Sequence, residues 1–162
     1  MRSAQWLFVV GALLFVFGIG FVVVAARSVR VAPAAESRAV QTPVASVKQI
    51  MAGIVGPGAA TVFESVSTTV TEKGIEEKAP GTDVEWAQVG NSAAAIAEAG
   101  NLLMMEGRAV DRGDWMKMSQ AMIEAARETL KAVAAKDAEG ILAAGEPLNT
   151  SCDSCHSRYQ RQ

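Results

Sequence analysis

The sequence predicts an all-α protein, an antiparallel four-helix bundle preceded by one N-terminal transmembrane helix. Near the N-terminus, Trp6–Ala26 form an unbroken apolar run of 21 residues without a charge. In residues 46–162, apolar residues recur at the spacing of amphipathic helices, and no convincing strand alternation is present. The short links between the later helical segments imply that neighbouring helices run antiparallel.

Residues 1–27 are expected to be a membrane anchor or an uncleaved signal. A helix as long as the apolar run would measure roughly 31 Å at about 1.5 Å per residue, enough to cross the hydrocarbon core. A cleaved secretory signal is the alternative, with Val24-Ala25-Ala26 as the cleavage site, but its apolar region is usually only about 7 to 15 residues. Basic residues follow the run, so the positive-inside rule alone does not favour export of the remainder.

The rest of the chain is expected to be a tether and one domain. Residues 28–45 contain Pro33 and Pro43, many alanines and no apolar period, which predicts a flexible linker. Residues 46–162 are long enough for one domain with its own core. That stretch holds 11 Lys and Arg against 16 Asp and Glu, a net charge near −5. Nucleic acid is therefore not expected as a partner.

The first helical segment of the domain is expected at about residues 44–67. Proline at Pro57-Gly58 removes one backbone donor and crowds the preceding turn, so a kink or break is expected there. Residues 68–82 contain several turn-forming residues and are expected to be a connection. One face of the segment is apolar at helical spacing and consists of Val47, Ile50, Met51, Ile54 and Val55.

Three further helices are expected after this connection. The second starts at Asp83 as N-cap and stops near Gly107, and the third starts at Asp114 as N-cap. The fourth starts near Asp137 and runs towards the C-terminus. Glycine or proline inside these helices is expected to mark a close helix contact or a bend, at Gly100, Gly145 and Pro147.

A CxxCH motif lies near the C-terminus, Cys152-Asp153-Ser154-Cys155-His156, and His156 is the only histidine of the chain. This pattern is typical of covalent c-type haem attachment. Two thiols three positions apart lie on one side of a helical turn and can each add to a vinyl group of one porphyrin. The imidazole that follows is a good ligand for haem iron.

Two other interpretations of this motif are open, a zinc site and a dithiol/disulfide pair. A structural zinc site needs four ligands, and only three soft ligands cluster here. A redox CxxC usually lies in a thioredoxin-like fold, and no such strand pattern is visible. Haem attachment through Cys152 and Cys155 is therefore the favoured interpretation.

With this motif and these helices, the chain resembles the class II cytochromes c, which are four-helix bundles with CxxCH in the last helix. The resemblance covers about residues 47–159 and includes Tyr159, an aromatic residue three positions after His156. It implies one covalent haem c with His156 as proximal iron ligand. It also implies a location in the bacterial inner membrane, crossed once, with the haem domain in the periplasm, or in the soluble periplasm if the N-terminus is cleaved.

The resemblance further implies that the first helix covers the distal haem face. Low-spin members have a methionine ligand there, and cytochrome c prime members have a nonligating apolar residue. Met51 is the expected distal ligand, although a methionine on an apolar face can also serve only in packing. Five other helix-spaced methionines are further alternatives: Met104, Met105, Met116, Met118 and Met122.

The expected function is one-electron transfer between redox protein partners by a membrane-tethered monohaem cytochrome. No enzyme activity is expected, because the sequence shows no nucleophile–base pair or phosphate loop. One alternative is a five-coordinate haem protein that binds or senses NO or CO, and another is a haem-free CxxC thiol protein of the envelope. Family members often pair through their first two helices, so a homodimer is also open. Lys48 and Arg158 could pair with haem propionates, but solvated surface charge is expected.

Overall fold

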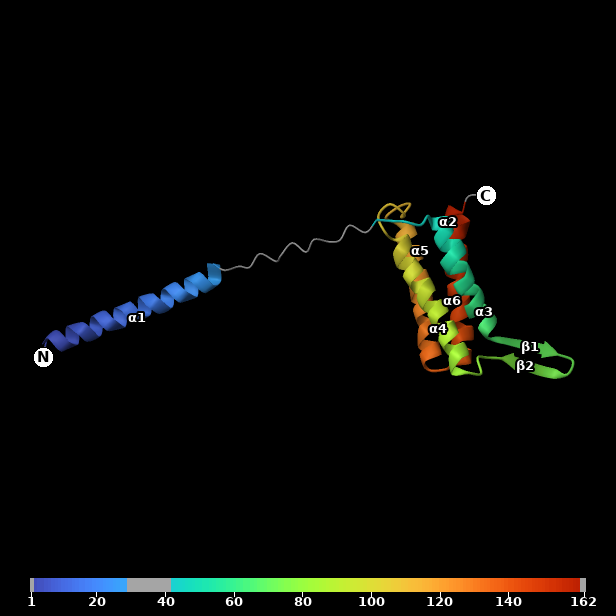
Figure 1. Cartoon of the computed structure of the whole chain (residues 1–162), viewed down its shortest axis with the longest axis horizontal. Coiled ribbons are helices and arrows are strands. Elements are labelled where there is room, and N and C mark those ends of the chain that lie inside the picture. The colour runs from blue at the N-terminus through green and yellow to red at the C-terminus, as the bar shows by residue number, and fades with distance from the viewer. Residues whose placement is uncertain (1, 29–41, 161–162) are drawn as a thin grey trace. The chain divides into compact units, whose positions relative to one another are not determined.

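The computed structural model describes residues 2–28 and 42–160 and divides the chain into two compact units, residues 1–40 and residues 41–162. In the first unit, α1 spans Arg2–Ser28 (Figure 1). Among the described residues, no helix combines the length and the apolar character needed to span a membrane. The anchor at residues 1–27 stays a prediction. Most of the linker predicted at residues 28–45 lies outside the described residues.

The second unit begins with three consecutive helical stretches: α2 (Val47–Ile50), the π-helical turn η1 (Met51–Val55) and α3 (Gly56–Ser65). Where a kink or break was predicted at Pro57-Gly58, the structure has this π-helical turn, which ends two residues before Pro57, and the helix continues beyond it as α3. The Gly56 N–H donates to the Met51 carbonyl, five residues back. A wider turn is the expected response to a proline ring that would crowd a carbonyl of the preceding α-helical turn.

A β-hairpin follows, largely within the connection predicted at residues 68–82, and its two strands were not predicted. Strands β1 (Ser67–Thr71) and β2 (Gly74–Lys78) pair antiparallel, with Val70 opposite Ile75. Gly74 has a φ of 131°, which closes the tight turn between the strands. The hairpin is exposed on both faces, so it needs no apolar–polar alternation and left no period-2 pattern to detect. Figure 1 shows it at the end of the helices opposite the C-terminus.

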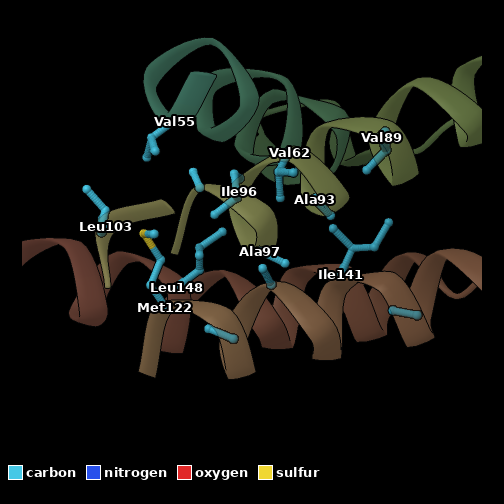
Figure 2. Packing of buried hydrophobic residues seen from close by; sticks show 14 of the residues in the cluster. Val55, Val62, Val89, Ala93, Ile96, Ala97, Leu103, Met122, Ile141 and Leu148 are labelled. Atoms are coloured by element: carbon cyan, nitrogen blue, oxygen red, sulfur yellow. The ribbon is translucent and has the colours of Figure 1, made fainter. Parts of the chain in front are cut away.

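The three longer helices of the unit are α4 (Asp83–Leu103), α5 (Asp114–Ala134) and α6 (Ala138–Tyr159). Contacts run from α3 to α4, from α4 to α5, from α5 to α6, and from α6 back to α3. These elements enclose one apolar core, part of which Figure 2 shows. The unit is mostly helical, and the helix positions predicted for it are confirmed within a few residues.

Both predicted helix caps, Asp83 and Asp114, were wrong by one residue. Thr82, not Asp83, caps α4, in a capping box with Glu85. Gly113 precedes α5, and the side chain that accepts the N–H groups of Gly113 and Trp115 belongs to Asp111. The fourth helix was expected to begin near Asp137, and Asp137 caps α6, because its side chain accepts the Gly140 N–H.

The close contact predicted at Gly100 joins α4 to α5. A Cβ atom added there would lie 2.4 Å from Cγ1 of Ile123 and 3.2 Å from the Ser119 carbonyl oxygen. We expect Gly100→Ala to lower the free energy of unfolding by about 1–3 kcal/mol, the usual cost of overpacking. Denaturant unfolding of the protein measures this.

Gly145→Ala is the matched control, because Gly145 also lies inside a long helix. An added Cβ there meets only Phe63, at 3.9 Å. Replacing glycine by alanine should therefore raise the free energy of unfolding by about 0.5–1 kcal/mol. Equal effects of the two substitutions would contradict a tight α4–α5 contact at Gly100.

Candidate functional site

The CxxCH motif lies in the last turns of α6, and its two cysteines lie on the side of the helix that faces the interior of the unit. Cys152 and Cys155 are half-buried and do not form a disulfide, and His156 is exposed. All three side chains line one small cavity of about 30 Å³ inside the second unit. The helix thus presents two thiols and an imidazole to a common space, as the sequence predicted from their spacing.

The opposite walls of this cavity come from the first helical stretch and from the junction of α4 and α5. Met51 lies on the wall at the beginning of η1, so the structure brings the predicted distal residue to the same cavity as the motif. Figure 2 shows Val55, Leu103 and Met122 together at one end of the apolar core. The lining residues besides the motif are Met51, Val55, Leu103, Met118, Ser119, Met122 and Ser151.

Three methionines therefore line the cavity, and not Met51 alone. Met118 and Met122, both on α5, share it. The other candidates named from the sequence, Met104, Met105 and Met116, are not among its lining residues. Met105 instead accepts a hydrogen bond from Arg108 at its sulfur, at 3.0 Å. The geometry reduces the set of possible sulfur ligands to three.

Arg108 holds the beginning of the first helical stretch against the end of α4. Its Nε donates to the Ala45 carbonyl at 2.9 Å, and its Nη1 donates to the Leu102 carbonyl at 3.1 Å. Ala45 directly precedes the capping box that starts α2, in which Ser46 and Gln49 bond each other. This contact fixes where η1, with Met51, lies relative to Leu103. This contact could not be predicted, because a side chain bonded to distant carbonyls leaves no periodic pattern in the sequence.

Side-chain contacts join the end of α6 to the residues at the start of α5. The Tyr159 hydroxyl donates a hydrogen bond to Asp111, and its ring meets Trp115 edge-on at 5.0 Å. The Trp115 indole in turn donates to the Leu103 carbonyl at 2.9 Å. Arg158 forms a surface ion pair with Asp114 at 2.8 Å, and its side chain is exposed, as expected for a solvated charge. These contacts place the helical turn that carries His156.

Asp111 is the acceptor at the centre of this network. The hydrogen bond from Tyr159 lowers the pKa of the Asp111 carboxyl below its ordinary value, and the N–H groups of Gly113 and Trp115 lower it further. The same hydrogen bond raises the pKa of the Tyr159 phenol. A carboxyl whose pKa is lower in the folded state stabilises that state above its unfolded pKa. This contribution is lost as the pH falls through the folded pKa.

We therefore expect Asp111→Asn to lower the melting temperature at pH 7 and to weaken its dependence on pH below roughly pH 4, where an unperturbed Asp takes up its proton. Thermal unfolding followed by circular dichroism between pH 2 and pH 7, as the approximate range set by that pKa, measures both effects. Asp153→Asn on the exposed side of α6 is the control and should change neither. An unaltered pH profile in Asp111→Asn would contradict the network.

The surroundings of the two thiols do not resemble those of a reactive dithiol. Burial is the main cause that raises the pKa of both Cys152 and Cys155 above the ordinary thiol value. Reactive CxxC pairs have lowered pKa values and commonly lie at helix N-termini, whereas this pair lies at the C-terminal end of α6. The dithiol interpretation therefore loses support. Within residues 2–28 and 42–160, no group of three or more His, Cys, Asp or Glu side chains could hold a metal ion.

The residues of the cavity fit a covalently attached haem in their donor atoms. Thiols and an imidazole line one wall, thioethers line another, and the remainder is mainly apolar. The cavity is small, because ligand sites usually measure about 300–1,000 Å³. Met118 and Ser151 also line a groove of about 840 Å³ between α5 and α6. Met118 and Ser151 are thus the residues that the groove and the cavity share.

Comparisons of the chain with models of protein families, with characterised proteins and with solved structures found no match. The resemblance to class II cytochromes c therefore stays a prediction that rests on the residues of the chain.

Proposed function

We propose that residues 46–162 form an antiparallel four-helix bundle of the class II cytochrome c type, which carries one covalent haem c and transfers single electrons between redox protein partners. One observation carries this proposal. Cys152, Cys155 and His156, near the C-terminus, line the same buried cavity as Met51 from the first helix. The pairing of CxxCH with a thioether across an apolar space is the ligand arrangement of an electron-transfer haem.

Each residue at the cavity has a distinct task in this proposal. Cys152 and Cys155 hold the macrocycle by thioether bonds, so that it cannot dissociate. His156 is the proximal ligand and Met51 the distal ligand, whose thioether favours the reduced iron. Val55 and Leu103 form an apolar wall that excludes water. When bound, the haem supplies the iron that accepts and releases one electron.

The proposal includes the place of the protein in the cell. Residues 1–27 anchor it in the bacterial inner membrane, and the haem domain lies in the periplasm, where c-type haem is attached. The unbroken apolar run of the N-terminal segment supports the anchor. The acidic domain, with its net charge near −5, suits protein partners and not nucleic acid.

The test is a spectrum of the full chain, expressed in a bacterium that attaches haem c and separated into membrane and soluble fractions. The pyridine haemochrome should show c-type haem in the membrane fraction, and the reduced protein should be low-spin and unaffected by CO. A high-spin reduced spectrum that shifts with CO would instead favour a protein that binds NO or CO. Unmodified thiols at Cys152 and Cys155 in the mass spectrum would leave only the haem-free thiol protein.

A further inference from the structure

Ser119 carries a buried hydroxyl group that the packing of the helices leaves without a partner. The residue is 3% exposed, and its Oγ has no hydrogen-bond partner among the described residues. The other two buried hydroxyl residues behave differently. Thr129 donates to the Ala125 carbonyl at 3.2 Å, and Ser151 donates to the Leu148 carbonyl at 2.7 Å, each within its own helix. Ser119 has the same option in α5 and does not use it.

The position of Ser119 in the fold indicates which group its hydroxyl could bind. It lines the cavity that CxxCH and Met51 also line. In the haem-loaded protein the two thiols are consumed by the thioether bonds, and the imidazole binds iron. The Ser151 hydroxyl is already bonded to its own helix. Ser119 is therefore the side chain of this cavity that still has a strong hydrogen-bond donor available, because methionine offers none.

We propose that the Ser119 hydroxyl, which has no acceptor among the described residues of this structure, would donate a hydrogen bond to the Met51 sulfur when Met51 binds the haem iron. The inference rests on the proposed function and adds to it a residue that tunes the distal side. A hydrogen bond to the thioether draws electron density away from the iron and favours the reduced state. A small ligand that replaces Met51 accepts the same hydrogen bond.

Carbon monoxide reports on this donor once Met51 is removed. In Met51→Ala, CO should bind the iron and accept the hydrogen bond from Ser119. In Met51→Ala/Ser119→Ala, the C–O stretching band should move to higher frequency and CO should leave about 2- to 10-fold faster, which corresponds to the loss of one hydrogen bond. Ser119→Thr in the same background keeps the hydroxyl and should restore both values.

Thr129→Val in the Met51→Ala background is the matched control, since it removes a buried hydroxyl of α5 outside the cavity and should change neither the stretch nor the release rate. The pyridine haemochrome of each variant shows that covalent haem is present. Identical CO stretch and release with and without Ser119 would overturn the role of Ser119 and leave the cytochrome intact. A Met51→Ala protein that does not bind CO would also overturn the assignment. A wild-type chain without haem would overturn both proposals.

Discussion

Replacing Cys152 and Cys155 together by serine is expected to remove all covalently bound haem from the protein. The two thiols are the only cysteines of the chain, and both line the cavity together with His156. Serine keeps the size of the side chain but cannot form a thioether. Haem staining after denaturing electrophoresis, and retention of the pigment through acid–acetone extraction, measure the covalent fraction. That fraction should fall to the background level.

The single variants and one control make this result specific. Cys152→Ser and Cys155→Ser each leave one thiol and should retain part of the covalent haem. Ser154→Ala changes an exposed residue between the two cysteines and should retain all of it. Covalent haem in the double variant at the level of the unmodified protein would rule out attachment at this motif.

The sequence predicted helices wherever burial imposed a period on it. Ile96, Ile141 and Leu148 are almost fully buried, and each lies on an apolar face that the 3.6-residue spacing revealed. The hairpin of β1 and β2 was not predicted, because neither of its faces is buried. Burial therefore imposed no alternation of apolar and polar residues on its strands. Helix caps were misplaced for another reason. Several polar residues stand before α4 and α5, and only the backbone conformation decides which of them bonds the free N–H groups.

The part of the candidate site that lies within one helix could be predicted from the sequence. Cys152, Cys155 and His156 follow one another within a helical turn and a half, so their common direction follows from helix geometry alone. Met51 could be predicted only from the family resemblance, because it lies far from the motif in the sequence and no local spacing relates the two. Arg108 and Ser119 could not be found in this way. Their roles depend on which carbonyls and which cavity wall lie beside them, and these emerge only when the helices pack.

The three cavity methionines explain why sequence spacing could not single out one ligand. Met118 and Met122 lie four residues apart on α5 and therefore on one face, as gap-filling core residues do. Met51 differs in its setting, because it begins the π-helical turn η1. Single π-turns inside helices occur frequently at functional sites, since the wider turn changes the direction of the side chains.

Met51→Leu is expected to change the coordination of the iron without much change in packing. Leucine has about the volume of methionine, so the free energy of unfolding should fall by less than about 1.5 kcal/mol. Loss of the sulfur ligand should convert the reduced spectrum to high-spin and allow CO to bind. It should also lower the reduction potential by on the order of 0.1 V, a fraction of the roughly 0.8 V range that axial ligands cover. Visible spectroscopy and a redox titration measure these changes.

The other methionines of the chain separate ligation from packing. Met116→Leu alters a residue that packs against the core outside the cavity, and it should leave both spectrum and potential unchanged. Met118→Leu and Met122→Leu change the other two sulfur atoms that line the cavity. If either of them, and not Met51→Leu, produced the high-spin spectrum, the distal ligand would come from α5. The π-turn at Met51 would then serve only to accommodate Pro57, and the first helix would be a cover for the haem and not a source of its ligand.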